Sequence, residues 1–482
     1  MTRQRLFLLV VALLMIALSW YGVLSARAGL VVRSRFVEGV PLVYVAPQRA
    51  EKVPGVLVAH GFAGSKQLML GYAHVLAHAG YAVMLWDFGG HGANATPLES
   101  LSRPYNVDVA YSVLQSQPEV DPSRLALLGH SMGSGSVMSA GIRNPERFAA
   151  TVAISPTGAA VTQQVPRNLQ LQAGSWEGFF VANAQRLLEA AGGESENLAA
   201  GRGRSLVIIP NAEHITILFR NASHQAALRW FDSTFGVQTT SSYVDRRMAW
   251  YGLHLLGWLI MLSAVAPVAS PSTECTSKVY WFKSWGGLLL APLVASGVLT
   301  LISGRSDLQS LGGLLVGGAV GFWFFVAGTV WLGILFSLPR PTVRAVGLGV
   351  ALFVLLWVAF GAMAQLVWLQ WWLIPVRLRL WFLLSLAFFP WFLASGVAQQ
   401  GVGFGKRVAW WLGQSTALVG GFLLTLQFLP QLSFIFLLIP LFPILMALFS
   451  YAAAMVNQVW SYAIGCALFF GWAIAAAFPL GG

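Results

Sequence analysis

Cysteine is almost missing from this sequence, which contains only Cys275 and Cys466. Two cysteines so far apart give neither a disulfide framework nor the ligand spacing of a metal site. We expect no metal site, and we expect no cofactor.

Charged residues are also scarce, at 10% of the chain, while 57% of the residues are hydrophobic and 20 are tryptophan. This composition excludes an ordinary soluble protein and is typical of a chain that lies mostly in lipid. From Met248 onward the only acids are Glu274 and Asp307, whereas residues 30–245 have ordinary polar composition and seven of the eight histidines. We predict a soluble domain over 30–245 and a membrane domain over 246–482.

The first long apolar run, residues 6–24, is long enough to cross a hydrocarbon core of about 30 Å as a helix. Arg3 and Arg5 precede it, and Ala26-Arg27-Ala28 has the small residues of a cleavage site, so a signal peptide is the alternative. Because the run is long for a signal peptide, we favour a transmembrane anchor over 1–29.

Further apolar runs predict about eight helices in the membrane domain. The prolines near 430–445 leave open whether that stretch is one broken helix or two. The runs lie near residues 248–269, 285–303, 311–338, 345–371, 378–397, 408–429, 432–450 and 457–480.

Short loops rich in Lys and Arg mark the cytoplasmic side of a membrane protein. If the N-terminus lies in the cytoplasm, the larger set of basic loop residues also lies on the cytoplasmic side: Lys278, Lys283, Arg340, Arg344, Lys406 and Arg407. The smaller set then lies on the opposite side: Arg305, Arg377 and Arg379. We predict a multi-pass protein of the cell membrane with an extracytoplasmic soluble domain. The net charge of +12 fits contact with membrane lipids; without a basic cluster that interleaves aromatics, it indicates no nucleic-acid partner.

Short apolar runs alternate with helix-compatible segments in the soluble domain. We expect a hairpin at residues 31–47, followed by strands that begin near residues 53, 81, 124, 148, 167 and 205. This alternation predicts an α/β fold with a mostly parallel sheet and helices on both faces. Chemistry in such sheets gathers at the carboxyl ends of the strands, where four of these runs carry residues suited to acyl transfer.

Ser131 stands in the pentapeptide Gly129-His130-Ser131-Met132-Gly133, after an apparent strand and before an apparent helix. A Gly-x-Ser-x-Gly pattern arises easily by chance among 50 glycines, and a plain strand-to-helix turn is the alternative. The strand-turn-helix setting favours a nucleophile, because it lifts the serine hydroxyl clear of the sheet.

A serine nucleophile needs a histidine base that follows it in sequence. His214 comes just after an apolar strand, whereas His224 falls on a helix and His254 in a membrane span. For the acid that orients the histidine, Glu177 is best placed, because it follows a strand end in Gly174-Ser-Trp-Glu177. The other glutamates between Ser131 and His214 are worse placed and leave the acid open to a neighbour: Glu146, Glu189, Glu194, Glu196 and Glu213.

The developing oxyanion needs backbone N–H donors. Met132, directly after the serine, supplies one. The segment Ala59-His60-Gly61-Phe62, at another strand end, offers the N–H of Phe62 as the second, although a simple strand-ending turn would look the same.

These motifs together resemble the α/β-hydrolase superfamily, most closely its dienelactone hydrolase, lysophospholipase and serine aminopeptidase-like branches. The resemblance covers about residues 35–236 and rests on HGFAGS (60–65), DFGGHG (87–92), GHSMG (129–133), GSWE (174–177) and His214. It implies an α/β-hydrolase fold with a loop-shaping, non-catalytic Asp87. It also implies the site roles: Ser131 as nucleophile, His214 as base, Glu177 as acid, and Phe62 and Met132 as oxyanion donors.

Two departures from the family pattern bear on function. The acid is Glu where Asp is commoner, and only about twenty residues, 155–174, separate two strands where a large lid domain would otherwise fit. A short cap suits acyl substrates presented at a lipid surface.

We therefore expect a membrane-anchored serine hydrolase that cleaves an ester, amide or lipid acyl bond, with a small-molecule or lipid acyl substrate as its partner. The alternative is a transport or scaffold protein whose extracytoplasmic domain keeps the fold without turnover. Against transport, the predicted spans contain no Asp or Glu.

Overall fold

The computed structural model describes residues 2–99, 102–238, 241–269, 281–335 and 338–481. Glu274, Cys275 and Lys278 lie outside the described residues. The chain divides into two compact units. One contains Met1–Ala17, Leu253–Ala362 and Leu373–Gly482; the other contains Leu18–Gly252 together with Met363–Trp372.

The second unit is built on an eight-stranded sheet in the order β1-β2-β4-β3-β5-β6-β7-β8. The hairpin of β1 and β2 forms as predicted, and β2 pairs antiparallel with β4. From β4 onward every neighbouring pair is parallel. The strands are β1 Leu30–Val37, β2 Val40–Pro47, β3 Val53–Ala59, β4 Ala82–Trp86, β5 Val120–His130, β6 Ala150–Ile154, β7 Leu169–Gly174 and β8 Arg204–Ile209.

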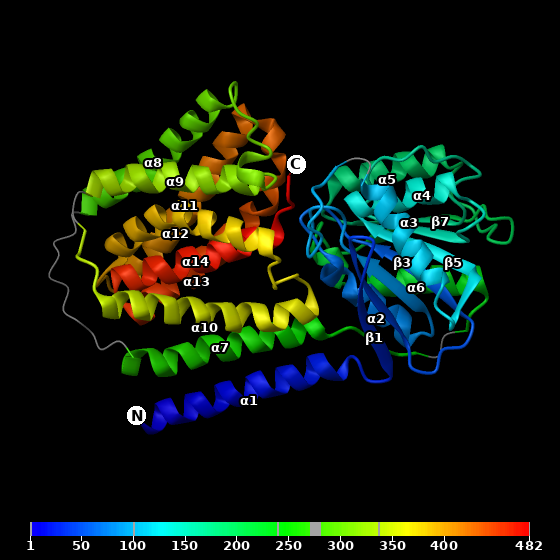
Figure 1. The fold of residues 1–482 in the computed structure, drawn as a ribbon, viewed down its shortest axis with the longest axis horizontal. Coiled ribbons are helices and arrows are strands. Elements are labelled where there is room, and N and C mark those ends of the chain that lie inside the picture. The colour runs from blue at the N-terminus through cyan, green and yellow to red at the C-terminus, as the bar shows by residue number, and fades with distance from the viewer. Residues whose placement is uncertain (1, 100–101, 239–240, 270–280, 336–337, 482) are drawn as a thin grey trace. The chain divides into compact units, whose positions relative to one another are not determined.

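Helices cover both faces of this sheet (Figure 1). Alternate strand residues face opposite sides, so Val56 and Val58 pack with α2 (Leu70–His78) and α6 (Asn221–Phe235), whereas Leu57 packs with α3 (Ser102–Gln115) and α4 (Met132–Arg143). Residues of α5 (Gly178–Ala190) join α4 in a third cluster over β6 and β7. The predicted α/β-hydrolase fold with a mostly parallel sheet is confirmed.

The first unit consists of long apolar helices. Eight helical stretches among the described residues are long and apolar enough to cross a membrane, which indicates a multi-pass membrane protein. They are Arg3–Ser25, Arg247–Val265, Trp281–Ile302, Gly317–Leu335, Val343–Val367, Pro375–Gln399, Pro430–Val456 and Val459–Ala477. In order, these stretches are α1, α7, α8, α9, α10, α11, a stretch that ends in α13, and α14. Helix α7 continues to Ala269, and α13 itself is Phe442–Val456. Helix α12, Phe404–Phe428, lies between α11 and this stretch.

Small residues let these helices approach closely. A Cβ on Gly328 of α9 would lie 2.2 Å from the backbone nitrogen of Trp391 in α11, so the two backbones touch at this glycine. Prolines break the stretch that the sequence left open: Pro430–Leu437 and Ile439–Leu441 form 3₁₀ helices before α13 begins at Phe442.

Candidate active site

Ser131 sits in a sharp turn between the last residue of β5, His130, and the first of α4, Met132. Its backbone has φ +52° and ψ −121°, a strained conformation that holds the side chain out of the sheet. The turn has no space for side chains on its two glycines: a Cβ on Gly129 would lie 2.4 Å from the carbonyl oxygen of Gly133. A Cβ on Gly133 would lie 2.5 Å from the carbonyl oxygen of His60, so α4 begins directly against the end of β3.

His214 lies in the loop after β8 and connects Ser131 to Glu177. Its Nε2 is 3.0 Å from Ser131 Oγ, and its Nδ1 is 2.7 Å from Oε1 of Glu177. Since a carboxylate only accepts hydrogen bonds, Nδ1 carries the proton and Nε2 is left to accept from the serine hydroxyl. The His214 side chain is 22% exposed and that of Glu177 only 2%, so the chain of hydrogen bonds runs from an accessible hydroxyl to a buried carboxylate.

Glu177 is held by groups on two neighbouring strand ends. Its Oε2 accepts from the backbone N–H of Gly174, at 2.6 Å, and from Oγ of Ser155, at 2.9 Å. Ser155 follows β6, and its own backbone is at φ +44°, so a second strained residue faces the site. Both carboxylate oxygens are thus satisfied in a buried position.

The two expected oxyanion donors belong to segments that adjoin Ser131. The N–H of Met132 belongs to the first turn of α4, where backbone N–H groups have no partner within the helix. Phe62 belongs to the turn in which the N–H of Gly64 donates to the carbonyl oxygen of Gly61, at 3.1 Å. A Cβ on Gly61 would lie 3.1 Å from Cβ of Ser131, so this turn packs directly on the serine.

Asp87 organises the loop of residues 60–67, hereafter loop 60–67, together with the loop after β4. Its Oδ1 accepts from the N–H of Lys66 at 2.8 Å, its Oδ2 accepts from the N–H of Ala93 at 2.8 Å, and the Lys66 ammonium pairs with Oδ2. His60 adds a further contact, because its Nε2 accepts from the N–H of Phe88 at 3.1 Å. Asp87 is fully buried and contacts loops, not the hydroxyl of Ser131.

Comparison with known proteins bears on the fold of this unit. Residues 50–229 match the family model described as Serine aminopeptidase, S33. This part of the chain is an α/β-hydrolase domain.

Proteins similar to this chain include two bacterial sequences and a solved structure. Over 103 residues the chain is 32% identical to an uncharacterised protein of Mycobacterium tuberculosis; the alignment covers 21% of this chain and 36% of that protein. Over 107 residues it is 30% identical to an uncharacterised 31.7 kDa protein of Escherichia coli, with 21% and 37% covered. The chain thus spans little more than a third of the length of these curated relatives. The dienelactone hydrolase of Anabaena variabilis is 21% identical, with 42% of this chain and 97% of that chain covered and a TM-score of 0.32.

Three residues of the hydrolase domain that the sequence did not single out surround His214 and Glu177. Besides Ser155, Phe180 of α5 stacks on the His214 ring at a centroid distance of 4.4 Å and an angle of 17°. His130 lies on the other side, 4.7 Å between ring centroids, and its Nε2 donates to the carbonyl oxygen of His214 at 2.9 Å. Of Ser155, Phe180 and His130, only His130 could have been identified from the sequence, because it lies inside the Gly129–Gly133 motif.

Burial lowers the pKa of His130 well below its ordinary value, and the neighbouring His214 lowers that pKa further. His130 therefore stays neutral and donates steadily to the loop that carries His214. Of the competing acids, Glu213 uses both carboxylate oxygens on the N–H groups of Ile215 and Thr216, away from the imidazole. Within the described ranges, no group of three His, Cys, Asp or Glu side chains could hold a metal ion.

Proposed function

We propose that this protein is a membrane-anchored serine hydrolase that cleaves an ester through an acyl-enzyme. The observation that carries the proposal is the continuous chain of hydrogen bonds from Ser131 through His214 to Glu177, at 3.0 Å and 2.7 Å. Nucleophile, base and orienting acid in this order are what acyl transfer by serine requires.

In the proposed reaction, Oγ of Ser131 attacks the carbonyl carbon of the ester while its proton passes to Nε2 of His214. The carbonyl oxygen becomes an oxyanion that accepts from the N–H groups of Phe62 and Met132. His214 then gives its proton to the leaving alcohol oxygen, the C–O bond breaks, and the acyl group stays on Ser131. Water then attacks the acyl carbon while His214 takes its proton; the bond from this carbon to Oγ of Ser131 breaks, Oγ takes the proton back from His214, and the acid is released. An amide would follow the same steps, with an amine as the first leaving group.

The ionised carboxylate of Glu177 stabilises the imidazolium that forms in both halves of this reaction. The Nδ1–H bond to Glu177 also fixes the tautomer, so that Nε2 of His214 is free to receive the serine proton. Ser155 and Gly174 hold the carboxylate in place from behind.

An apolar acyl group is the substrate class that the surroundings favour. Trp176 and Phe179, on either side of Glu177 in sequence, are 67% and 72% exposed, and Phe180 stacks on the base. The connection from β6 to β7, residues 155–168, contains no helix and supplies no lid. Exposed aromatics beside a partly exposed histidine base suit an acyl chain presented at a lipid surface.

The same proposal includes the sequence-based arrangement: an anchor over 1–29, a hydrolase domain over 30–245 facing away from the cytoplasm, and a membrane domain over 246–482. The asymmetry of Lys and Arg between the short loops supports this orientation in the cell membrane.

The test is turnover of p-nitrophenyl esters of increasing acyl length by the purified full chain in detergent, compared with Ser131→Ala. We expect hydrolysis by the wild type, higher kcat/KM for micellar long-chain esters than for short soluble ones, and loss of at least about a thousandfold in the variant. Equal activity on short and long esters would contradict the lipid-surface substrate. No turnover by a folded wild type would favour the transport or scaffold alternative.

A further inference from the structure

A segment from the C-terminal half of the chain is part of the hydrolase unit. Residues Met363–Trp372, the last turn of α10 and the connection to α11, fall in the same compact unit as Leu18–Gly252. Trp368 packs against the core cluster between the sheet, α2 and α6. The carbonyl oxygen of Leu366 accepts from the buried guanidinium of Arg247 at 3.3 Å. We name residues 363–372 the docked segment.

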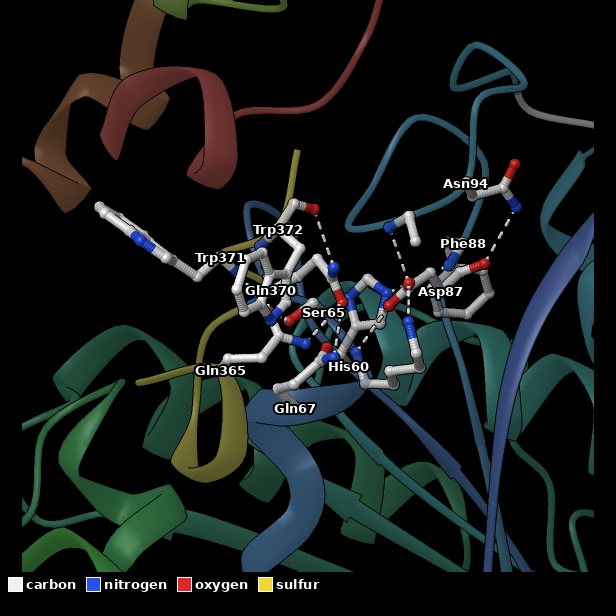
Figure 2. Close-up of polar contacts among 12 residues, drawn as sticks. His60, Ser65, Gln67, Asp87, Phe88, Asn94, Gln365, Gln370, Trp371 and Trp372 are labelled. Atoms are coloured by element: carbon white, nitrogen blue, oxygen red, sulfur yellow. Dashed lines mark hydrogen bonds and ion pairs between the residues drawn. The ribbon is translucent and has the colours of Figure 1, made fainter. Parts of the chain in front are cut away.

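Gln370 joins the docked segment to loop 60–67 through two hydrogen bonds (Figure 2). Its side-chain Oε1 accepts from Nε2 of Gln67 at 2.6 Å, across 303 residues of sequence, and its backbone N–H donates to Oγ of Ser65 at 3.2 Å. Ser65, Gln67 and Gln370 are 2%, 6% and 8% exposed. These bonds are therefore shielded from water, where a lost partner costs most.

Gln365 gives the docked segment its shape. Its Oε1 accepts from the backbone N–H groups of Trp371, at 2.6 Å, and Trp372, at 3.1 Å. Nε2 of Gln370 in turn donates to the carbonyl oxygen of Trp372 at 3.0 Å. The segment thus folds back on itself, which fixes the Gln370 side chain before it meets Gln67 (Figure 2).

Loop 60–67 is held from two sides. Asp87 accepts from the N–H of Lys66. Gln370 contacts Ser65 and Gln67, the residues immediately before and after Lys66, as Figure 2 shows. The turn that contains Phe62 precedes this clamped stretch and has Ala63 at φ +56°, a conformation that a non-glycine residue keeps only when its surroundings impose it. Gly61 at the start of the turn packs on Ser131.

We propose that Gln370 is a positioning residue that aims the N–H of Phe62 at the developing oxyanion. The proposal rests on the proposed function. Gln370 follows α10, whereas the residues of the site itself all lie before residue 215. On this proposal the hydrolase domain depends on the C-terminal half of the chain for its full activity.

The effect is confined to the transition state. The oxyanion forms only there, so a loosened donor lowers kcat and leaves KM nearly unchanged. Loss of an oxyanion donor typically costs a hundredfold to a thousandfold in kcat, and a misplaced donor costs less. We expect Gln370→Ala to lower kcat by about tenfold to about a hundredfold.

The experiment measures kcat and KM of the full chain in detergent with a soluble ester, together with inhibition by an alkyl boronic acid that forms a tetrahedral adduct on Ser131. Gln370→Ala should weaken boronate binding by the same factor as it lowers kcat, with KM changed less than about twofold. A variant that is merely less stable would contain fewer active molecules. Its apparent kcat would fall, but its remaining active molecules would bind the boronate as tightly as the wild type does.

Gln67→Ala tests the contact from its other side, in case Gln370→Ala fails to fold. If both residues act through their shared hydrogen bond, the double variant should lose little more than either single variant. Gln414→Ala is the matched control: this buried glutamine of α12 accepts from Ser395 at 2.7 Å within the helical unit, and its loss should leave kcat unchanged.

The outcomes separate this proposal from the proposed function. If the wild type does not hydrolyse esters and does not bind the boronate, the proposed function fails. If the wild type is active but Gln370→Ala and Gln67→Ala keep kcat within about twofold, or the losses multiply in the double variant, the positioning role is wrong.

Discussion

The backbone N–H of Gly174 donates a 2.6 Å hydrogen bond to Oε2 of Glu177, three residues further along the chain. This bond turns the glutamate back toward the end of β7, so that its other oxygen faces Nδ1 of His214. A Cβ on Gly174 would lie 2.9 Å from the same Oε2, so the position also needs glycine. The geometry explains how a glutamate serves where an aspartate is commoner: the longer side chain spans the turn.

Glu177→Gln should lower kcat/KM by about three to four orders of magnitude, because an amide stabilises no imidazolium and can impose the wrong tautomer on His214. Glu177→Asp should cost less, about tenfold to about a hundredfold, since a shorter carboxylate cannot reach both Gly174 and His214. Kinetics with one soluble ester measure both, and Glu213→Gln, whose carboxylate caps a neighbouring turn, is the matched control. Similar losses in Glu177→Gln and Glu213→Gln would refute the assignment.

Gly133→Ala should destabilise the hydrolase domain by about 3 kcal/mol or more, because its Cβ would meet the backbone of Ala59, the last residue of β3, and of His60 directly after it, neither of which can rotate away. Gly178→Ala, on the first turn of α5 with nothing within 4 Å of its Cβ, should be neutral or slightly stabilising. Denaturant unfolding followed by pulse proteolysis compares the two. Equal stabilities would mean that α4 does not start against β3.

The buried pair of Asp87 and Lys66 should be costly to break from one side. Their side chains are 0% and 7% exposed, so Asp87→Ala leaves an ammonium group buried without its partner and should cost about 3 to about 5 kcal/mol. Glu146→Ala, which removes an exposed pair with Arg147 at 3.8 Å, should change stability by less than about 0.5 kcal/mol. If both variants unfold at the same denaturant concentration, Asp87 does not organise loop 60–67.

Acid should destabilise the hydrolase domain through its buried histidines. Burial lowers the pKa values of His60, His74, His130 and His224 below the ordinary 6.5. The unfolded chain therefore binds protons on these rings as the pH falls below about 6.5, while the folded domain does not. Stability is fully present above that pH and declines below it, by up to about 1.4 kcal/mol per pH unit for each ring.

Unfolding free energies measured between about pH 5 and about pH 8 check this slope. His224→Gln, which keeps a donor for the carbonyl oxygen of Leu218, should reduce the slope by about one proton. A stability that is flat through this range would contradict the account of buried neutral rings.

The sequence allowed a good prediction of the parts that depend on local pattern. Alternating apolar runs predicted the parallel sheet, and because strand ends share one edge, Ser131, His214 and Glu177 could be brought together from residue type and order. The support of Glu177 by Ser155 and the contact of Phe180 with His214 depend on side-chain packing, which no short motif encodes.

A different reason explains why the sequence does not predict the docked segment. Gln365 and Gln370 lie at the end of an apolar run, 345–371, that hydropathy assigns as a whole to the membrane domain. The partners of Gln370 in loop 60–67, Gln67 and Ser65, are 303 and 305 residues away in sequence, and a glutamine carries no pattern that identifies its hydrogen-bond partner.

Reaction of the full chain with a fluorophosphonate probe, followed by peptide mass spectrometry, tests whether Ser131 is the nucleophile. We predict one labelled peptide, carrying the probe on Ser131, with labelling abolished in Ser131→Ala and slowed by about a thousandfold or more in His214→Ala. Folded protein that stays unlabelled, or that is labelled on another residue at the same rate in all three forms, would contradict the account.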